Sequence, residues 1–220
     1  NLSTKKIIFL TGGTGMVGSN ILKHKLSDHW DIIAPTRNNL DLSDYETTLK
    51  FVSKLNPFIT IHAAGTVGGI QANISNPYKF LEENLIVGRN VINASKVCNV
   101  KNFVNLSSSC IYPKNSSSPL SENLVLEGAL EPSNEGYAIA KITSLKLCEY
   151  LKKSYPEYNY KTLIPCNLYG PYDTFDIFKS HLLPAIIMKV HHAIKHNENE
   201  IEIWGDGKAK REFMFVSDLV

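Results

Sequence analysis

Short apolar segments alternate with longer amphipathic segments along most of the chain. Runs rich in β-branched and aromatic residues predict strands at 6–11, 31–34, 58–62, 102–106 and 160–164. Apolar residues at helical spacing predict helices over 16–26, 43–55, 77–97 and 135–155, the second beginning with a capping box of Ser43 and Glu46. Strands separated by helices of this length indicate a doubly wound, parallel α/β sheet whose apolar strands are buried on both faces.

The pattern changes after residue 170. We expect a helix over 181–196 and strands at 200–204 and 213–216. Residues 1–170 are therefore predicted to form one domain, and residues 171–220 part of a second, smaller one. A helix beginning at Ser217 would be too short to be stable alone, which predicts a native protein longer than this sequence.

Composition and charge exclude several classes of protein. Hydrophobic residues make up 43% of the chain and charged residues 20%, which is ordinary for a globular protein. The net charge of +2, without a basic cluster, gives no argument for a nucleic-acid partner. No apolar run reaches the roughly 20 residues of a membrane span, and no signal-peptide core precedes the first strand. Four scattered cysteines form no CxxC pair, so we expect free thiols, no metal site and a cytoplasmic location.

A glycine-rich turn joins the first strand to the first helix. Its glycines permit a tight turn and let backbone N–H groups approach a pyrophosphate, which the helix N-terminus also attracts. In this strand–turn–helix setting the pattern indicates a Rossmann dinucleotide site rather than a plain turn. The segment consists of Gly12, Gly13, Thr14, Gly15, Met16, Val17 and Gly18.

The end of the second strand distinguishes the two nicotinamide cofactors. NAD sites place an acid there to bind the ribose 2′-hydroxyl, whereas this chain has Arg37. A guanidinium can bind a 2′-phosphate with two hydrogen bonds, so the sequence favours NADP(H). Asp41 follows closely and is expected beside the adenine. The alternative for Arg37 is a solvated surface side chain.

A tyrosine and a lysine four residues apart stand in the predicted helix over 135–155. Tyr137 and Lys141 therefore share one face of that helix. A free tyrosine has a pKa near 10, and a neighbouring ammonium stabilises the phenolate, so we expect Lys141 to lower the pKa of Tyr137. The alternative is an incidental surface pair, which the glycine turn and the serine-rich end of the fourth strand disfavour.

Several longer stretches resemble one family. Those at 67–70, 108–114, 130–135, 137–142, 167–171, 180–181, 184–185, 204–205 and 211–213 are similar to the GDP-L-fucose synthase family of extended short-chain dehydrogenase/reductases. The resemblance spans the whole chain. It implies an NADPH-dependent enzyme that inverts C-3 and C-5 of a GDP-4-keto-6-deoxy sugar and reduces C-4, and that forms a homodimer.

The resemblance also implies roles for individual residues. Ser108 and Tyr137 would bond the C-4 oxygen with Lys141 in support, and Cys110 and His181 would be the acid/base pair. The substrate would contact Lys189, Trp204 and Arg211. The cofactor would be lined by Leu106, Ser107, Ser108, Ser109, Lys141, Pro165, Cys166, Asn167, Leu168 and His181. The family often has arginine at Lys189 and glycine at Ser107, which leaves open which of the three serines faces the substrate; we favour Ser108.

Elementary chemistry is consistent with these roles. A hydrogen next to a ketone becomes acidic when hydroxyl donors stabilise the developing oxyanion. Cysteine and histidine both have pKa values that proteins adjust for proton transfer. Two alternatives remain open: an enzyme acting on another GDP-4-keto sugar, such as a heptose, and a non-catalytic NADP-binding regulator. The set of Ser108, Tyr137 and Lys141 argues against the regulator, because a pure binder needs no tuned phenol.

Overall fold

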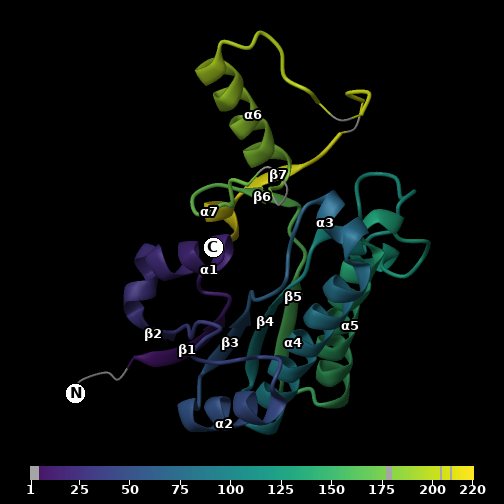
Figure 1. Ribbon diagram of the computed structural model, residues 1–220. Helices are drawn as coiled ribbons and strands as arrows, with labels where there is room; N and C mark the ends of the chain where they lie inside the picture. Colours follow the sequence, from purple (N-terminus) through teal and green to yellow (C-terminus); the bar gives the residue numbers. More distant parts are fainter. Residues whose placement is uncertain (1–4, 177–179, 204, 209) are drawn as a thin grey trace.

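The centre of the molecule is a parallel sheet of five strands in the order β2-β1-β3-β4-β5 (Figure 1). The computed structural model describes residues 5–176, 180–203, 205–208 and 210–220. Ile8 of β1 pairs with Ile32 on one side and with Ile59 on the other. The strands are β1 (Lys6–Thr11), β2 (Trp30–Ile33), β3 (Ile59–His62), β4 (Asn102–Leu106) and β5 (Asn159–Leu163). The predicted parallel α/β fold is thereby confirmed.

Helices cover the sheet in layers. Helices α2, α4 and α5 pack side by side on one face, and right-handed crossovers place α1 on the other. The longer helices are α1 (Met16–Lys23), α2 (Tyr45–Leu55), α4 (Pro77–Val97) and α5 (Glu135–Ser154). The short α3 (Ile70–Ser75), which the sequence analysis did not predict, follows β3. Short 3-10 helices are η1 (Lys25–His29), η2 (Ser109–Ile111), η3 (Glu122–Leu124) and η4 (Pro132–Asn134).

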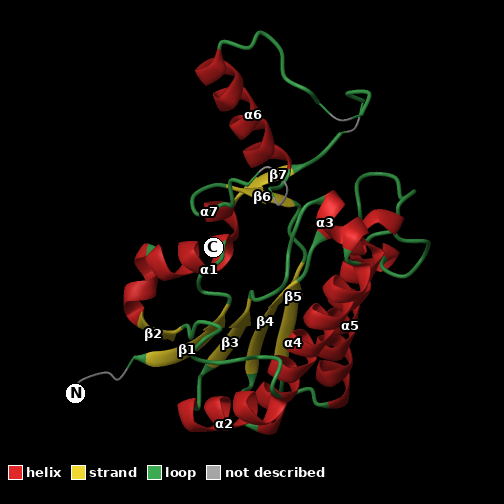
Figure 2. Ribbon diagram, viewed as in Figure 1, coloured by secondary structure: helices red, strands yellow, loops and turns green. Residues whose placement is uncertain are grey.

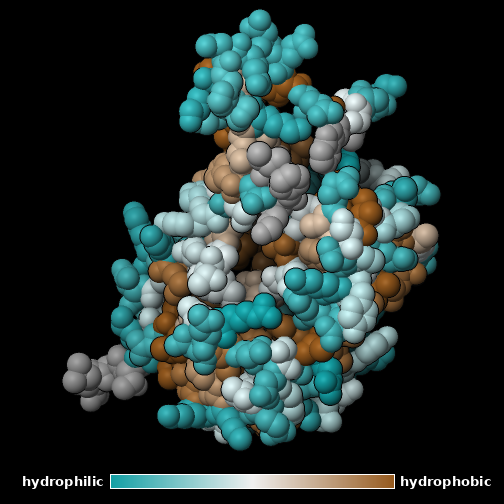
Figure 3. Space-filling model, in the orientation of Figure 1, coloured by the Kyte–Doolittle hydropathy of each residue, from teal (hydrophilic) through white to brown (hydrophobic). Residues whose placement is uncertain are grey.

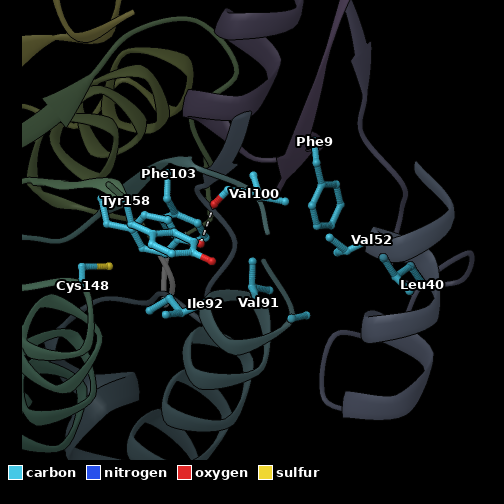
Figure 4. Close-up of a cluster of buried hydrophobic side chains, with 11 residues drawn as sticks. Phe9, Leu40, Val52, Val91, Ile92, Val100, Phe103, Cys148 and Tyr158 are labelled. Atoms are coloured by element: carbon cyan, nitrogen blue, oxygen red, sulfur yellow. Dashed lines mark hydrogen bonds between the residues drawn. The ribbon is translucent and has the colours of Figure 1, made fainter. Parts of the chain in front are cut away.

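One cluster of buried side chains joins the sheet to this helical layer (Figure 4). Phe9 and Phe103 from the sheet meet Val52 of α2 and Val91 of α4. The ring of Tyr160 stacks on Phe103 at 4.8 Å between centroids, and its hydroxyl donates to the Val100 carbonyl at 3.0 Å. The hydroxyl of this buried tyrosine thus has its hydrogen-bond partner within the protein.

The opposite face of the sheet is less covered than predicted. In β3 and β4 buried residues alternate with half-buried ones. Thr60 and Phe103 are buried on the side of α4, whereas Ile61 and Val104 on the other side are only partly covered. The expectation of burial on both faces is therefore wrong for these strands, because helices pack closely on one side only.

A second, smaller part lies beyond the carboxyl ends of the strands (Figure 2). It holds α6 (Leu182–His196) and a parallel pair of short strands, β6 (Asn167–Tyr169) and β7 (Phe213–Phe215). Helix α7 (Val216–Leu219) packs on α1. The sequence analysis missed β6, and the predicted strand at 200–204 does not form over Glu200–Ile203, where Lys189 of α6 instead donates to the Glu202 carbonyl.

The end of α1 and the start of α2 differ from the prediction. The first helix ends at Lys23, and a 3-10 helix replaces its predicted last turn. Helix α2 is capped by Asp44, whose carboxylate accepts from the Thr47 amide at 3.1 Å, so the capping box at Ser43 is wrong. Ser43 donates to Asp41 instead. No helix within the described residues combines the length and apolar character needed to cross a membrane.

Candidate functional site: a cavity at the carboxyl ends of the strands

The glycine turn sits where the strand order reverses, between β1 and β3. Gly12 has φ +75°, and a β-carbon there would lie 2.7 Å from the backbone of Ala63 and Ala64. A β-carbon on Gly18 would collide with the Gly12 carbonyl. No side chain caps α1 at Gly15. The turn therefore brings bare backbone and a helix N-terminus to the position where open α/β sheets bind a pyrophosphate.

Buried polar groups hold the turn against β3. Thr11 Oγ1 lies 2.7 Å from His62 Nδ1 and accepts from the Ala64 amide at 3.2 Å. Both side chains are buried at the ends of neighbouring strands. This network fixes the backbone of Ala63 and Ala64, against which Gly12 packs, and so holds the glycine turn, the cradle for a pyrophosphate, in place.

One large cavity of about 1480 Å³ opens from this cradle. Figure 3 shows the hollow between the two parts of the molecule, with apolar surface inside it. Its volume exceeds the ~300–1,000 Å³ of common small-molecule sites, which leaves room for a dinucleotide and a second ligand. The predicted site residues that line it are Gly12, Gly13, Thr14, Gly15, Met16, Val17, Gly18, Arg37, Asp41, Leu106, Ser107, Ser108, Ser109, Cys110, Tyr137, Lys141, Pro165, Cys166, Asn167, Leu168, His181, Lys189 and Arg211. Trp204 lies outside the described residues.

Arg37 and Asp41 border the cavity beyond β2. The Asp41 carboxylate accepts from the Ser43 amide at 2.9 Å and from its hydroxyl at 2.7 Å, and these bonds lower the pKa of Asp41. The Asp41 carboxylate therefore already accepts two hydrogen bonds from within its own loop. Asn90 of α4, which the sequence analysis missed, donates to the carbonyls of Leu42 and Ser43 at 3.0 and 2.9 Å and holds this wall from behind.

Lys141 and Tyr137 meet beneath the end of β4. The Lys141 side chain is buried, and its Nζ donates to the Leu106 carbonyl at 3.0 Å and lies 5.6 Å from the centre of the Tyr137 ring. Burial lowers the pKa of Lys141 to about 8. Burial also raises the pKa of Tyr137 above its usual value, so the expected lowering by Lys141 is wrong. Desolvation of the phenolate outweighs an ammonium that is directed at a carbonyl.

Cys110 follows β4 in η2, close to the same lysine. Burial raises the pKa of its thiol, and the Ser108 side chain and the charge of Lys141 oppose that rise. Ser107 is buried, and its hydroxyl has no partner among the described residues. Ser108 and Ser109, by contrast, are only partly covered, and Ser108 contacts Cys110.

The remaining predicted residues lie in the outer part of the cavity. His181 is exposed at the start of α6, where its side chain makes no capping bond. Lys189 Nζ donates to the Glu202 carbonyl at 2.7 Å. Arg211 donates to the Lys210 carbonyl at 2.8 Å. These basic side chains, of which Lys189 is half-buried and His181 and Arg211 are exposed, all line the cavity.

The other cysteines and the acidic groups carry no further site. All four cysteines are free, as predicted, and Cys148 belongs to the hydrophobic core. In the part of the chain that the structure describes, no three His, Cys, Asp or Glu side chains are grouped so that they could hold a metal ion.

The sequence analysis underestimated the loop between β3 and α3. Residues 63–71 line the cavity, together with Asn73, Glu131, Ser133 and Asn134. The Gly68–Gly69 pair in the segment that follows β3 was the available signal, because the carboxyl ends of parallel strands border the site.

The chain is similar in sequence to known proteins over nearly its whole length. The sequence model described as the NAD dependent epimerase/dehydratase family matches residues 8–220. GDP-L-colitose synthase of Yersinia pseudotuberculosis is 52% identical over 212 residues, which are 96% of this chain and 69% of that protein. GDP-L-fucose synthase of Azorhizobium caulinodans is 49% identical over 214 residues, 97% of this chain and 68% of that protein.

Solved structures share the whole fold. A GDP-D-glycero-L-gluco-heptose synthase from Campylobacter jejuni, determined in the presence of NADPH, superposes with a TM-score of 0.88 at 29% identity and covers 100% of this chain and 73% of that one. These relatives confirm the resemblance drawn from the sequence. With a glycine cradle at the switch point, a tyrosine–lysine pair in the same cavity and a family match over nearly its full length, the chain belongs to the NAD dependent epimerase/dehydratase family.

Proposed function

We propose that this protein is an NADPH-dependent epimerase/reductase of the GDP-L-fucose synthase type, which inverts C-3 and C-5 of a GDP-4-keto-6-deoxy sugar and reduces C-4. The observation that carries the proposal is the convergence of Ser108, Cys110, Tyr137 and Lys141 on the cavity that also contains the glycine cradle. The names of the two related enzymes support this substrate class.

The cavity fits NADP(H) at its glycine-lined end. The 12–18 turn would hold the pyrophosphate, and Arg37 would bind the 2′-phosphate. Lys141 would bond the nicotinamide ribose, and the ends of β4 and β5 would flank the ring. Bound NADPH would supply the hydride that reduces C-4.

Two hydroxyl groups act on the C-4 oxygen in this proposal. Tyr137 keeps its proton at neutral pH because burial raises its pKa, so it donates a hydrogen bond. Ser108 provides a second donor. Together they stabilise negative charge on that oxygen while a proton leaves a neighbouring carbon, and Tyr137 later protonates the C-4 oxygen during reduction.

Cys110 and His181 carry the proton transfers at C-3 and C-5. Inversion requires one group to remove a proton and another to return one to the opposite side of the carbon. Burial raises the pKa of Cys110, so it enters the reaction as a thiol. His181 belongs to a different wall, at the start of α6, and supplies the second group.

The basic side chains of Lys189 and Arg211 are suited to the GDP diphosphate. Arg211 is exposed and Lys189 half-buried, and both line the cavity. A guanidinium binds phosphate oxygens with two parallel hydrogen bonds, which fixes the nucleotide end while the sugar reaches Tyr137.

A second substrate deserves a test because of one comparison. The structural relative from Campylobacter jejuni is named a GDP-heptose synthase. A reductase or epimerase of a GDP-4-keto heptose is therefore the alternative. The non-catalytic regulator remains disfavoured, since the buried Lys141 beside Tyr137 serves no purpose in a simple binder.

We further propose that the enzyme is cytoplasmic and pairs with a second copy through α4 and α5. Exposed Tyr78, Ile139 and Tyr150 on these two helices support such a contact. Sedimentation of the wild type and of Tyr150→Glu tests the pairing: the wild type should sediment as a dimer and the variant as a monomer.

The decisive experiment offers the full-length protein NADPH and a panel of GDP-4-keto sugars. Products are identified by NMR. Conversion of the 6-deoxy hexose with inversion supports the main proposal, and preferential conversion of the heptose supports the alternative. Absence of turnover with every sugar would contradict both.

A further inference from the structure

The chain passes over the catalytic centre immediately after β3, as a loop of residues 65–70. At one end, a β-carbon on Gly65 would lie 3.6 Å from Lys141 Nζ. At the other end the loop enters α3, and α3 packs against η4, the turn that leads to Tyr137. The loop lines the same cavity as both catalytic residues. It therefore borders the place where the sugar of the proposed substrate must lie.

Two buried asparagines bind the backbone of the 65–70 loop. Asn84 of α4 accepts from the Thr66 amide and donates to the Thr66 carbonyl, each at 3.0 Å. Asn73 of α3 donates to the carbonyls of Gly68 and Gly69 at 3.0 and 3.1 Å. Both asparagines are only 6% exposed. These backbone groups are thus already bonded to the protein, so they offer little to a ligand.

Packing behind the loop fixes its orientation. A β-carbon on Gly68 would lie 3.0 Å from the Phe80 ring and 3.1 Å from the Ala72 side chain. The loop backbone is therefore pressed against α3 and α4. Val67 and Ile70 are not part of this packing: they are 62% and 59% exposed and line the cavity.

The loop thus presents the apolar side chains of Val67 and Ile70 to the cavity that the catalytic residues also line. A methyl or methylene group of a ligand would remove this surface from water at no polar cost. A hydroxyl against these two side chains would lose its water and gain no bond from them, because neither side chain has a polar atom. The chemistry of the wall therefore matches a deoxygenated part of a sugar.

We propose that Val67 and Ile70 form the specificity-determining wall for the sugar, and that this wall selects a sugar whose C-6 is a methyl group over one whose C-6 carries a hydroxyl. The proposal rests on the proposed function, because it concerns the sugar handled at the same site. It assigns the preference to two side chains that take no part in proton or hydride transfer.

Binding of two nucleotide sugars that differ only at C-6 tests the wall. The full-length protein, loaded with NADP, is titrated with GDP-L-fucose and with GDP-L-galactose, its 6-hydroxylated counterpart. We expect the wild type to bind the 6-deoxy sugar more tightly. Val67→Ser and Ile70→Thr should each reduce the ratio of the two affinities by about tenfold, the low end of the effect of a single apolar contact.

Ile74→Ser is the matched control. Ile74 lies one helical turn after Ile70 on α3, is 53% exposed and does not line the cavity. This variant should keep the wild-type ratio, and NADPH affinity should be unchanged in all three variants. The ratio of the kcat/KM values for the 4-keto forms of the two sugars provides a second readout of this preference.

The outcomes separate the two proposals. A wild-type protein that turns over 6-deoxy substrate, with the same ratio in Val67→Ser and Ile70→Thr as in wild type, overturns the wall alone. An equal change in Ile74→Ser shows an indirect effect through α3 and also overturns it. A wild type that converts no GDP-4-keto sugar contradicts the proposed function. Equal affinity of the wild type for GDP-L-fucose and GDP-L-galactose contradicts the wall.

Discussion

Lys141 Nζ donates a hydrogen bond of 3.0 Å to the carbonyl oxygen of Leu106, and so ties the second turn of α5 to the last residue of β4. The bond lies at the floor of the cavity, directly before the serines at 107–109. It is made by a buried ammonium, whose charge is costly and whose pKa is therefore low.

The pH dependence of reduction should report this lysine. Burial lowers the pKa of Lys141 to about 8, so the residue is charged below that pH and neutral above it. Tyr137 keeps its proton throughout, because its pKa is raised. We expect the rate of hydride transfer to fall as pH rises through about 8, which stopped-flow oxidation of NADPH would measure. A rate that stays flat to pH 9.5 would contradict the assignment.

Removal of the buried charge should stabilise the fold. A pKa lowered from 10.5 to about 8 means that the charge of Lys141 destabilises the folded protein by about 3 kcal/mol at pH 7, since a shift of one pKa unit is worth about 1.36 kcal/mol. Lys141→Met removes that penalty and loses one hydrogen bond of about 1 kcal/mol. The variant should therefore be about 1–2 kcal/mol more stable at pH 7, although inactive.

The sign of this effect can be checked by varying the pH. Below about 8 both folded and unfolded lysine are charged and the penalty is complete. Between about 8 and 10.5 the folded protein loses the proton first, so the wild type becomes more stable relative to Lys141→Met. Urea unfolding at pH 7 and 9.5 measures the difference, and a gap that widens at pH 9.5 would refute the argument.

Arg37→Ala should weaken NADPH binding and spare NADH. The guanidinium borders the cavity where the 2′-phosphate is expected, and loss of a charged hydrogen bond costs about 1–3 kcal/mol. Fluorescence titration with both cofactors is the measurement. Arg89→Ala, at an exposed position of α4 outside the cavity, is the control. Equal affinity of the unmodified protein for NADH and NADPH would show that Arg37 does not select the cofactor.

Tyr137→Phe should abolish reduction and leave the fold intact. The change removes one hydroxyl at nearly constant volume, and with it the group that protonates the C-4 oxygen. Single-turnover oxidation of NADPH in the presence of the keto sugar measures the loss. Tyr150→Phe changes an exposed tyrosine of the same helix and should behave as wild type. Near-normal reduction by Tyr137→Phe would assign the acid to another residue.

Cys110→Ser should separate epimerisation from reduction. A serine hydroxyl is a poor acid/base, whereas Ser108, Tyr137 and Lys141 stay in place. Hydride transfer to the uninverted ketone should continue, while inverted product carrying solvent deuterium disappears. His181→Asn should give slow or partial inversion. NMR and mass spectrometry in deuterium oxide distinguish these products, and Cys98→Ser serves as a control. Wild-type inversion by Cys110→Ser would leave Cys110 with a packing role only.

The sequence by itself determined the features that depend on neighbouring residues. Pro77–Val97 and Asn102–Leu106 form the predicted helix and strand to the residue, because periodicity and apolar runs are local properties. The glycine turn and the Tyr137–Lys141 spacing are local as well. Their meeting in one cavity follows from a parallel sheet, in which all strand ends reach the same edge.

Tertiary structure decided what depends on distant partners. Asn84 and Asn90 hold backbone that is 18 and 47 or 48 residues away, which no local pattern predicts. Glu200–Ile203 has strand-like composition but found no strand to pair with, whereas β6 formed because Phe213–Phe215 lay beside it. The pKa of Tyr137 was misjudged for the same reason: the spacing to Lys141 is written in the sequence, but the burial that outweighs it is a property of the folded chain.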